Sequence, residues 1–137
     1  MTQIKVNYES EVLLLLLKKE AHGRELAKAL KTSLTRIQSV LNNLRRQNVV
    51  DYAVEGKNHV YFIKKNLLAR TSILSAENYK LAKLLCKYPF LEPLLKEVTQ
   101  KYRGQMVVLF GSYAKFIPKE ESDIDLYMDS TDKKAKD

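Results

Sequence analysis

Apolar and polar positions along the first half of the chain follow the period of α-helices. A leucine-rich run predicts a helix over residues 9–19, and a second helix is expected over residues 24–31. We expect Gly23 to end the first helix, as a residue with positive φ. Thr32-Ser33 is an N-cap signal for a third helix that runs to about residue 46. The apolar positions of this third helix form one stripe: Leu34, Ile37, Val40, Leu41 and Leu44.

The pattern then changes to the alternation that is typical of strands. Residues 49–54 and 59–63 flank the polar segment Glu55-Gly56-Lys57-Asn58, which predicts a β-hairpin. Residues 64–71 are interpreted as a linker, followed by a helix from about residue 75 to residue 88. Pro89 ends that helix. A further helix over residues 91–100 precedes an apolar, strand-like run at residues 106–110.

Three helices and a hairpin, with a short break between the second and third helices, resemble the winged helix-turn-helix family over about residues 8–66. The end of the third helix, Leu44-Arg45-Arg46-Gln47-Asn48-Val49-Val50, also fits that family. The resemblance implies binding of double-stranded DNA, with the third helix in the major groove. Because such proteins usually read two half-sites, it also implies a homodimer, with the helix around residues 79–88 as a candidate dimerisation element.

The polar face of the third helix is rich in side chains that hydrogen-bond to base edges and lacks glutamate. Four positions on one face are candidate base contacts, while two arginines near the helix end and the lysine at the hairpin tip are candidate phosphate contacts. These candidate DNA-binding residues are Thr35, Arg36, Ser39, Asn43, Arg45, Arg46 and Lys57. Two alternatives are a solvated polar face on a small helical domain and a protein-interaction module.

The strand-like run at residues 106–110 leads into Gly111-Ser112-Tyr113-Ala114-Lys115, and Ser122-Asp123-Ile124-Asp125-Leu126 follows. Gly111 permits a tight turn and close approach of the backbone to a ligand. The hydroxyl of Ser112 and free backbone N–H groups can bind phosphate oxygens. Asp123 and Asp125 alternate on a strand, so both carboxylates lie on one face, as a divalent cation would require.

These two motifs and their spacing resemble the nucleotidyltransferase signature of the DNA polymerase beta superfamily, over about residues 89–129. The resemblance implies transfer of a nucleoside monophosphate from Mg²⁺-bound ATP, or another NTP, to an acceptor hydroxyl. It assigns nucleotide binding to Gly111, Ser112 and Lys115. It assigns catalysis and Mg²⁺ binding to Asp123 and Asp125. Phe116 stands where the family usually has a glycine.

The family has a third carboxylate on a later strand. After Leu126 this chain offers Asp129, Asp132 and Asp137, and none of them resembles that position. Two interpretations stay open, a fragment of a longer protein and a half-domain that serves as a scaffold. The alternative to an enzyme is accordingly a transcriptional regulator or antitoxin-like protein. Its incomplete nucleotidyltransferase domain would bind a ligand, a protein acceptor or a toxin partner without catalysis.

The charge distribution favours a polyanionic partner for the N-terminal half. The net charge is +8, and residues 1–70 hold 13 Lys and Arg against 6 Asp and Glu. The single cysteine, Cys86, excludes an internal disulfide and fits a reducing cytosol. No signal peptide or membrane span is recognisable, so a cytoplasmic protein without membrane contact is expected. His22 and His59 lack partners at metal-ligand spacing.

The sequence therefore predicts an α+β chain in three parts. Residues 1–70 form a winged helix-turn-helix DNA-binding domain, and residues 71–88 a linker or dimerisation helix. Residues 89–137 form the N-terminal half of a nucleotidyltransferase domain, in the order helix, strand, Gly-Ser turn, strand.

Overall fold

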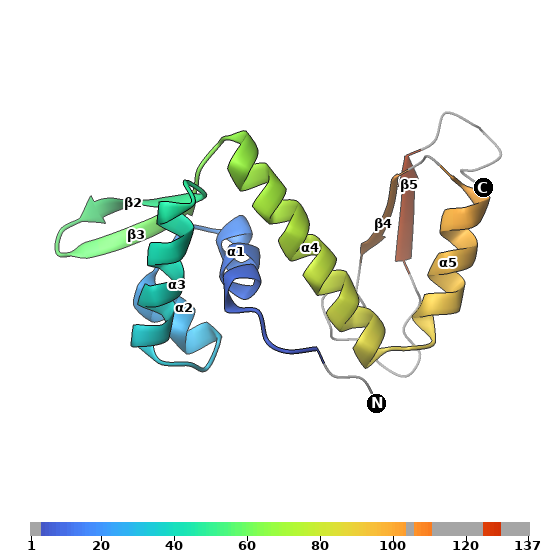
Figure 1. Ribbon diagram of the computed structural model, residues 1–137, viewed down its shortest axis with the longest axis horizontal. Coiled ribbons are helices and arrows are strands. Elements are labelled where there is room, and N and C mark those ends of the chain that lie inside the picture. The colour runs from blue at the N-terminus through green and yellow to red at the C-terminus, as the bar shows by residue number, and fades with distance from the viewer. Residues whose placement is uncertain (1–3, 104–105, 111–124, 130–137) are drawn as a thin grey trace. The chain divides into compact units, whose positions relative to one another are not determined.

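The computed structural model describes residues 4–103, 106–110 and 125–129. The chain divides into two compact units, the first over residues 4–81 and the second from residue 82 onward. Figure 1 labels all helices and strands of the two units except β1 (Ala21–His22).

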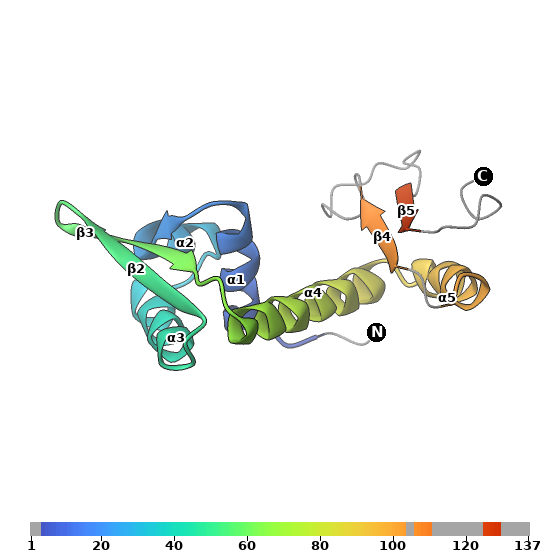
Figure 2. The same cartoon turned by 90° about the horizontal axis from the view of Figure 1, so that it is seen from above.

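Three helices and a small antiparallel sheet form the first unit: α1 (Tyr8–Lys18), β1 (Ala21–His22), α2 (Gly23–Ala29), α3 (Leu34–Arg46), β2 (Val50–Glu55) and β3 (Asn58–Ile63). The strand order is β1-β3-β2. The β2–β3 hairpin extends beyond the helices as a wing (Figures 1 and 2). This arrangement confirms the predicted winged helix-turn-helix.

The core of the first unit is built from the apolar stripes of its helices. Val12 of α1, Leu26 of α2, and Ile37 and Leu41 of α3 are all buried and belong to one cluster. Burial of a leucine or isoleucine side chain contributes roughly 1.5–3 kcal/mol. Most of the stripe predicted for the third helix therefore faces the core, whereas Leu34 at its start is exposed. The polar positions of the helix are left for solvent or a ligand.

Gly23 does not end the first helix, contrary to the sequence-based expectation. It is the first residue of α2, where His22 is the N-cap and the Glu25 side chain accepts a hydrogen bond from the His22 N–H at 3.1 Å. A Cβ atom at this position would lie 3.1 Å from Nε2 of Gln38 on α3, so the Gln38 side chain would have to shift. The two-residue strand β1, which precedes Gly23, was not predicted.

The wing is a tight hairpin. Glu55 pairs with Asn58, so the turn consists of Gly56 and Lys57 alone. Gly56 has φ of 62°, a conformation that glycine adopts without steric cost. Lys57 is therefore held at the tip of the wing.

The linker predicted at residues 64–71 is wrong, because α4 (Leu67–Lys87) is one continuous helix of 21 residues. The Asn66 side chain accepts a hydrogen bond from the Ala69 N–H at 2.7 Å and so provides a cap. Ala69 and Ala76 are buried in the core of the first unit. The Tyr79 hydroxyl donates to Glu11 at 2.9 Å, which ties α4 to α1.

The second unit contains the end of α4, α5 (Leu91–Lys101), β4 (Met106–Phe110) and β5 (Asp125–Asp129). Leu84 and Leu91 are buried together, with Leu85, Tyr88 and Leu95 packed against them. The strands β4 and β5 pair in antiparallel fashion. A helix followed by two strands matches the order expected for the start of a nucleotidyltransferase domain.

Candidate nucleic-acid interface

Local signals position α3 with its polar face outward. The Ser33 hydroxyl accepts a hydrogen bond from the Arg36 N–H at 3.2 Å, which fixes the start of the helix. Ile37, Leu41 and Leu44 are buried on the inner side. The opposite side contains no carboxylate, since α3 has none along its whole length. Apart from Leu34, which is 38% exposed, the exposed side chains of α3 are therefore polar or positively charged.

The structure distributes the seven predicted DNA-binding residues over this outer surface and the wing. Thr35, Arg36, Ser39, Arg45, Arg46 and Lys57 are exposed, and Asn43 is half-buried. Thr35, Ser39 and Arg46 lie on the middle of the outer face, as the helical period requires. The guanidinium of Arg36 lies 5.0 Å from the ring centroid of Tyr8, so Arg36 is on the side next to α1.

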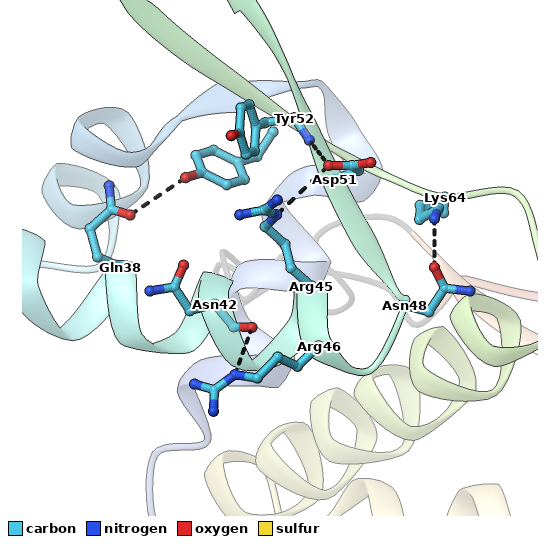
Figure 3. Close-up of polar contacts among 9 residues, drawn as sticks. Gln38, Asn42, Arg45, Arg46, Asn48, Asp51, Tyr52 and Lys64 are labelled. Carbon is cyan, nitrogen blue, oxygen red and sulfur yellow. Dashed lines mark hydrogen bonds and ion pairs between the residues drawn. The ribbon is translucent and has the colours of Figure 1, made fainter.

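Arg45 lies on the other side of α3, against the wing (Figure 3). Its guanidinium carbon is 4.4 Å from the ring centroid of Tyr52, and its Nε is 3.7 Å from Oδ1 of Asp51. The neighbouring Arg46 has a different environment, because its Nε–H donates to the carbonyl of Asn42 on the same helix at 3.4 Å. Arg45 thus links α3 to the wing, whereas Arg46 has its contact within α3.

Three aromatic side chains on the wing were missed by the sequence analysis. Tyr52 and His59 stack with ring centroids 4.0 Å apart, and Tyr61 lies at 5.6 Å from Tyr52. The signal was present in the sequence, because residues two apart on a strand share a face and Tyr52 pairs directly with Tyr61. His59 is exposed whereas Tyr61 is buried, so the cluster runs from the core toward the wing tip.

The buried end of this cluster is joined to α3 by a hydrogen bond. The Tyr61 hydroxyl donates to Oε1 of Gln38 at 3.4 Å. Burial raises the pKa of Tyr61 above its ordinary value of 10.0, and the nearby charge of Arg45 opposes this rise. Tyr61 is therefore a neutral hydrogen-bond donor at physiological pH.

Most of the predicted nucleotide site lies outside the described residues. Gly111, Ser112, Lys115 and Asp123 all fall there. Asp125 is the first residue of β5 and pairs with Phe110, the residue that precedes Gly111. The pairing therefore places Phe110, the last described residue before the Gly-Ser motif, opposite Asp125, the last residue of the Asp-Ile-Asp motif.

Asp129 is at the opposite end of β5, paired with Met106. Four residues of extended strand separate its Cα from that of Asp125 by about 13 Å. Within the described ranges, no group of three His, Cys, Asp or Glu residues is placed to hold a metal ion.

Comparison with protein families gives one match in the N-terminal half of the chain and one in the C-terminal half. Residues 6–65 match the model of the sugar-specific transcriptional regulator TrmB, and residues 91–136 match the nucleotidyltransferase domain. The chain combines a winged helix-turn-helix domain with a nucleotidyltransferase domain. Comparison with curated protein sequences gives no match.

Solved structures similar to the winged-helix domain are regulators. The adhesin competence repressor AdcR from Streptococcus pyogenes has a TM-score of 0.53 at 17% identity, over 71% of this chain and 74% of that chain. The transcriptional regulator BldR from Sulfolobus solfataricus has a TM-score of 0.49 at 15% identity, over 69% and 71%. The AdcR likeness is one of fold.

A third similar structure is the homodimeric winged helix-turn-helix DNA-binding domain of Mb0332 from Mycobacterium bovis, a possible ArsR-family regulator. It has a TM-score of 0.46 at 26% identity. The match covers 50% of this chain and 63% of that chain, which is less than two thirds of its length.

Among the described residues of the present chain, no helix is both long enough and apolar enough to cross a bilayer.

Proposed function

We propose that the winged-helix domain binds double-stranded DNA and that the protein is a cytoplasmic transcriptional regulator. The outer face of α3 carries this proposal, because it is exposed, free of carboxylates and rich in side chains that bond to bases and phosphates. The wing adds Lys57 at its tip. The regulator fold of AdcR supports the same function.

Base contacts are proposed for the predicted set on the outer face, Thr35, Arg36, Ser39 and Asn43. Arg46 and Lys57 are proposed phosphate contacts, since both are exposed. Arg45 belongs to the same proposed phosphate set, and its contacts with Asp51 and Tyr52 give it a second role in holding the wing against α3. Asn42, which is also exposed on α3, is added to the base-reading face.

A homodimer is the proposed form on DNA. Leu67, Leu74 and Leu81 of α4 are exposed and spaced by seven residues, so they share one helix face. A second copy of α4 is proposed to cover this leucine face, because two such faces are complementary to each other.

Sedimentation should show that Leu74→Glu converts the dimer to a monomer. Ser75→Glu, at the exposed neighbouring position, should leave the dimer intact.

The test of DNA binding is a salt titration. Duplexes are first selected from a random library, and the affinity of the best one is measured by fluorescence anisotropy over a range of salt concentrations. Arg46→Gln should lower the slope of log K against log salt by about 1, because one phosphate contact is lost. Lys80→Gln, the same charge change on α4, should leave the slope unchanged. An affinity that does not respond to salt would contradict any role in nucleic-acid binding.

A second candidate function concerns the C-terminal domain. We propose that it binds a Mg²⁺–NTP complex, with Gly111, Ser112 and Lys115 at the phosphates and Asp123 and Asp125 at the metal. The family match over residues 91–136 and the pairing of Phe110 with Asp125 support this proposal. In such a site the metal would supply charge neutralisation for transfer of a nucleoside monophosphate to a hydroxyl. The non-catalytic form of the proposal is a domain that binds a ligand, a protein acceptor or a toxin.

Calorimetry tests the nucleotide site, and a transfer assay distinguishes the catalytic form from the non-catalytic one. Mg²⁺ should raise the affinity for ATP, and the double variant Asp123→Ala with Asp125→Ala should abolish this gain. ATP binding that is indifferent to Mg²⁺ would refute the nucleotide site. Transfer of label from α-labelled ATP to an acceptor would establish catalysis, whereas Mg²⁺-dependent binding without transfer would establish the non-catalytic form.

A further inference from the structure

A notch of about 240 Å³ lies where three separate parts of the winged-helix domain meet. Arg24 comes from the start of α2, Gln38 from α3, and Lys57, Asn58 and His59 from the wing. None of the residues that line it is a carboxylate. The notch is therefore a polar, positively charged recess between elements that are far apart in the sequence.

The pairing of β1 with β3 holds these parts together. His22 pairs with Val60, and Nδ1 of His22 lies 3.2 Å from the carbonyl oxygen of His59. Gly23 leaves room for the Gln38 side chain to approach the start of α2. The Tyr61 hydroxyl, bonded to Gln38, lines the recess as well. The notch is thus built by backbone pairing and close packing.

The charges around the notch favour an anion. In the described part of the chain, neither Arg24 nor Lys57 makes an ion pair with a carboxylate. Glu25, the residue after Arg24, accepts a hydrogen bond from the His22 N–H at 3.1 Å and lies 3.8 Å from Nε2 of His22. Asn58 adds an amide donor. Two cations and further donors around a small recess match the oxygens of a phosphate group.

We propose that this notch binds one phosphodiester of the DNA backbone, with Arg24 on the α2 side and Lys57 on the wing side. The inference rests on the proposed DNA binding and assigns it a new contact residue, Arg24. A phosphate held between α2 and the wing fixes the register of α3 in the major groove, because both elements are anchored to the same domain.

The experiment uses the full chain and a selected duplex in which each backbone phosphate in turn is replaced by a neutral methylphosphonate. In the wild type, one replacement should lower affinity through loss of the notch contact. That replacement should have no further effect in Arg24→Gln or in Lys57→Gln. Each variant should also lower the salt slope by about 1, while Lys80→Gln should not. Circular dichroism melting checks that the variants fold like the wild type.

The outcomes separate this inference from the proposed function. A wild type without salt-dependent DNA binding refutes the proposed function. If the wild type binds, variants of Arg24 and Lys57 that behave like Lys80→Gln refute the notch alone. Sensitivity of the two variants to different phosphates also refutes it, because the two cations would then contact separate groups.

Discussion

The contact between Arg45 and Tyr52 predicts a measurable link between α3 and the wing. The guanidinium lies 4.4 Å from the ring centroid, a geometry that contributes about 0.5–1 kcal/mol at exposed sites. The ion pair with Asp51 spans 3.7 Å between side chains that are about half-exposed, and such pairs contribute roughly 0.2–1 kcal/mol. Arg45→Met keeps the aliphatic stem and removes both interactions. We expect it to lower the free energy of unfolding by about 1 kcal/mol.

The assay is urea unfolding followed by far-ultraviolet circular dichroism, with a double-mutant cycle over Arg45→Met and Tyr52→Leu. The coupling energy should be about 0.5–1 kcal/mol. Arg46→Met is the matched control, because Arg46 is exposed and its Nε–H bonds only within α3, to Asn42. The control should change stability by less than about 0.5 kcal/mol. Equal costs for the two arginine variants, together with zero coupling, would refute the link.

Three further predictions concern the stability of the first unit. Burial raises the pKa of Tyr61. The contribution of the neutral Tyr61 side chain to the free energy of unfolding is therefore complete below pH 10.0 and is lost as the pH rises through the folded-state pKa. Tyr61→Phe should therefore reduce the loss of stability in alkaline urea titrations. Asn66→Ala should lower the free energy of unfolding in urea by about 1 kcal/mol, because the α4 cap is lost. Asn66→Asp should keep most of that stability, because a carboxylate oxygen can accept the same hydrogen bond. Leu41→Ala, at a fully buried site, should cost about 2–5 kcal/mol and lower the melting temperature.

Elements with strong local signals were predictable from the sequence. The third helix was expected after Thr32-Ser33 and up to about residue 46, and α3 (Leu34–Arg46) agrees, because Ser33 caps it and its apolar stripe has a regular period. The wing was predictable for a similar reason, since Gly56 meets the requirement of its turn. In both cases the deciding interactions join residues that are near one another in the sequence.

The elements that were missed depend on distant contacts. The first turns of α4 are stabilised by burial of Ala69 and by the cap at Asn66, whose side chain also donates to the Asn48 carbonyl. Alanines add little to an apolar pattern, so residues 64–71 resembled a linker. The strand β1 exists because His22 pairs with Val60, far along the chain. Such pairings leave no periodic signal in a two-residue segment.

For the candidate interface, the sequence indicated the polar face of α3 but not the different roles of its cations. A count of charges treats the arginines of α3 alike. In the structure Arg36 lies over the ring of Tyr8 and Arg45 over the ring of Tyr52, whereas Arg46 and the wing-tip Lys57 are exposed without such ring contacts among the described residues. An arginine over a ring keeps its charge, but its guanidinium is fixed in place. The fold therefore positions Arg36 and Arg45 on the two sides of α3, next to α1 and to the wing, and leaves Arg46 and Lys57 exposed for the proposed phosphate contacts.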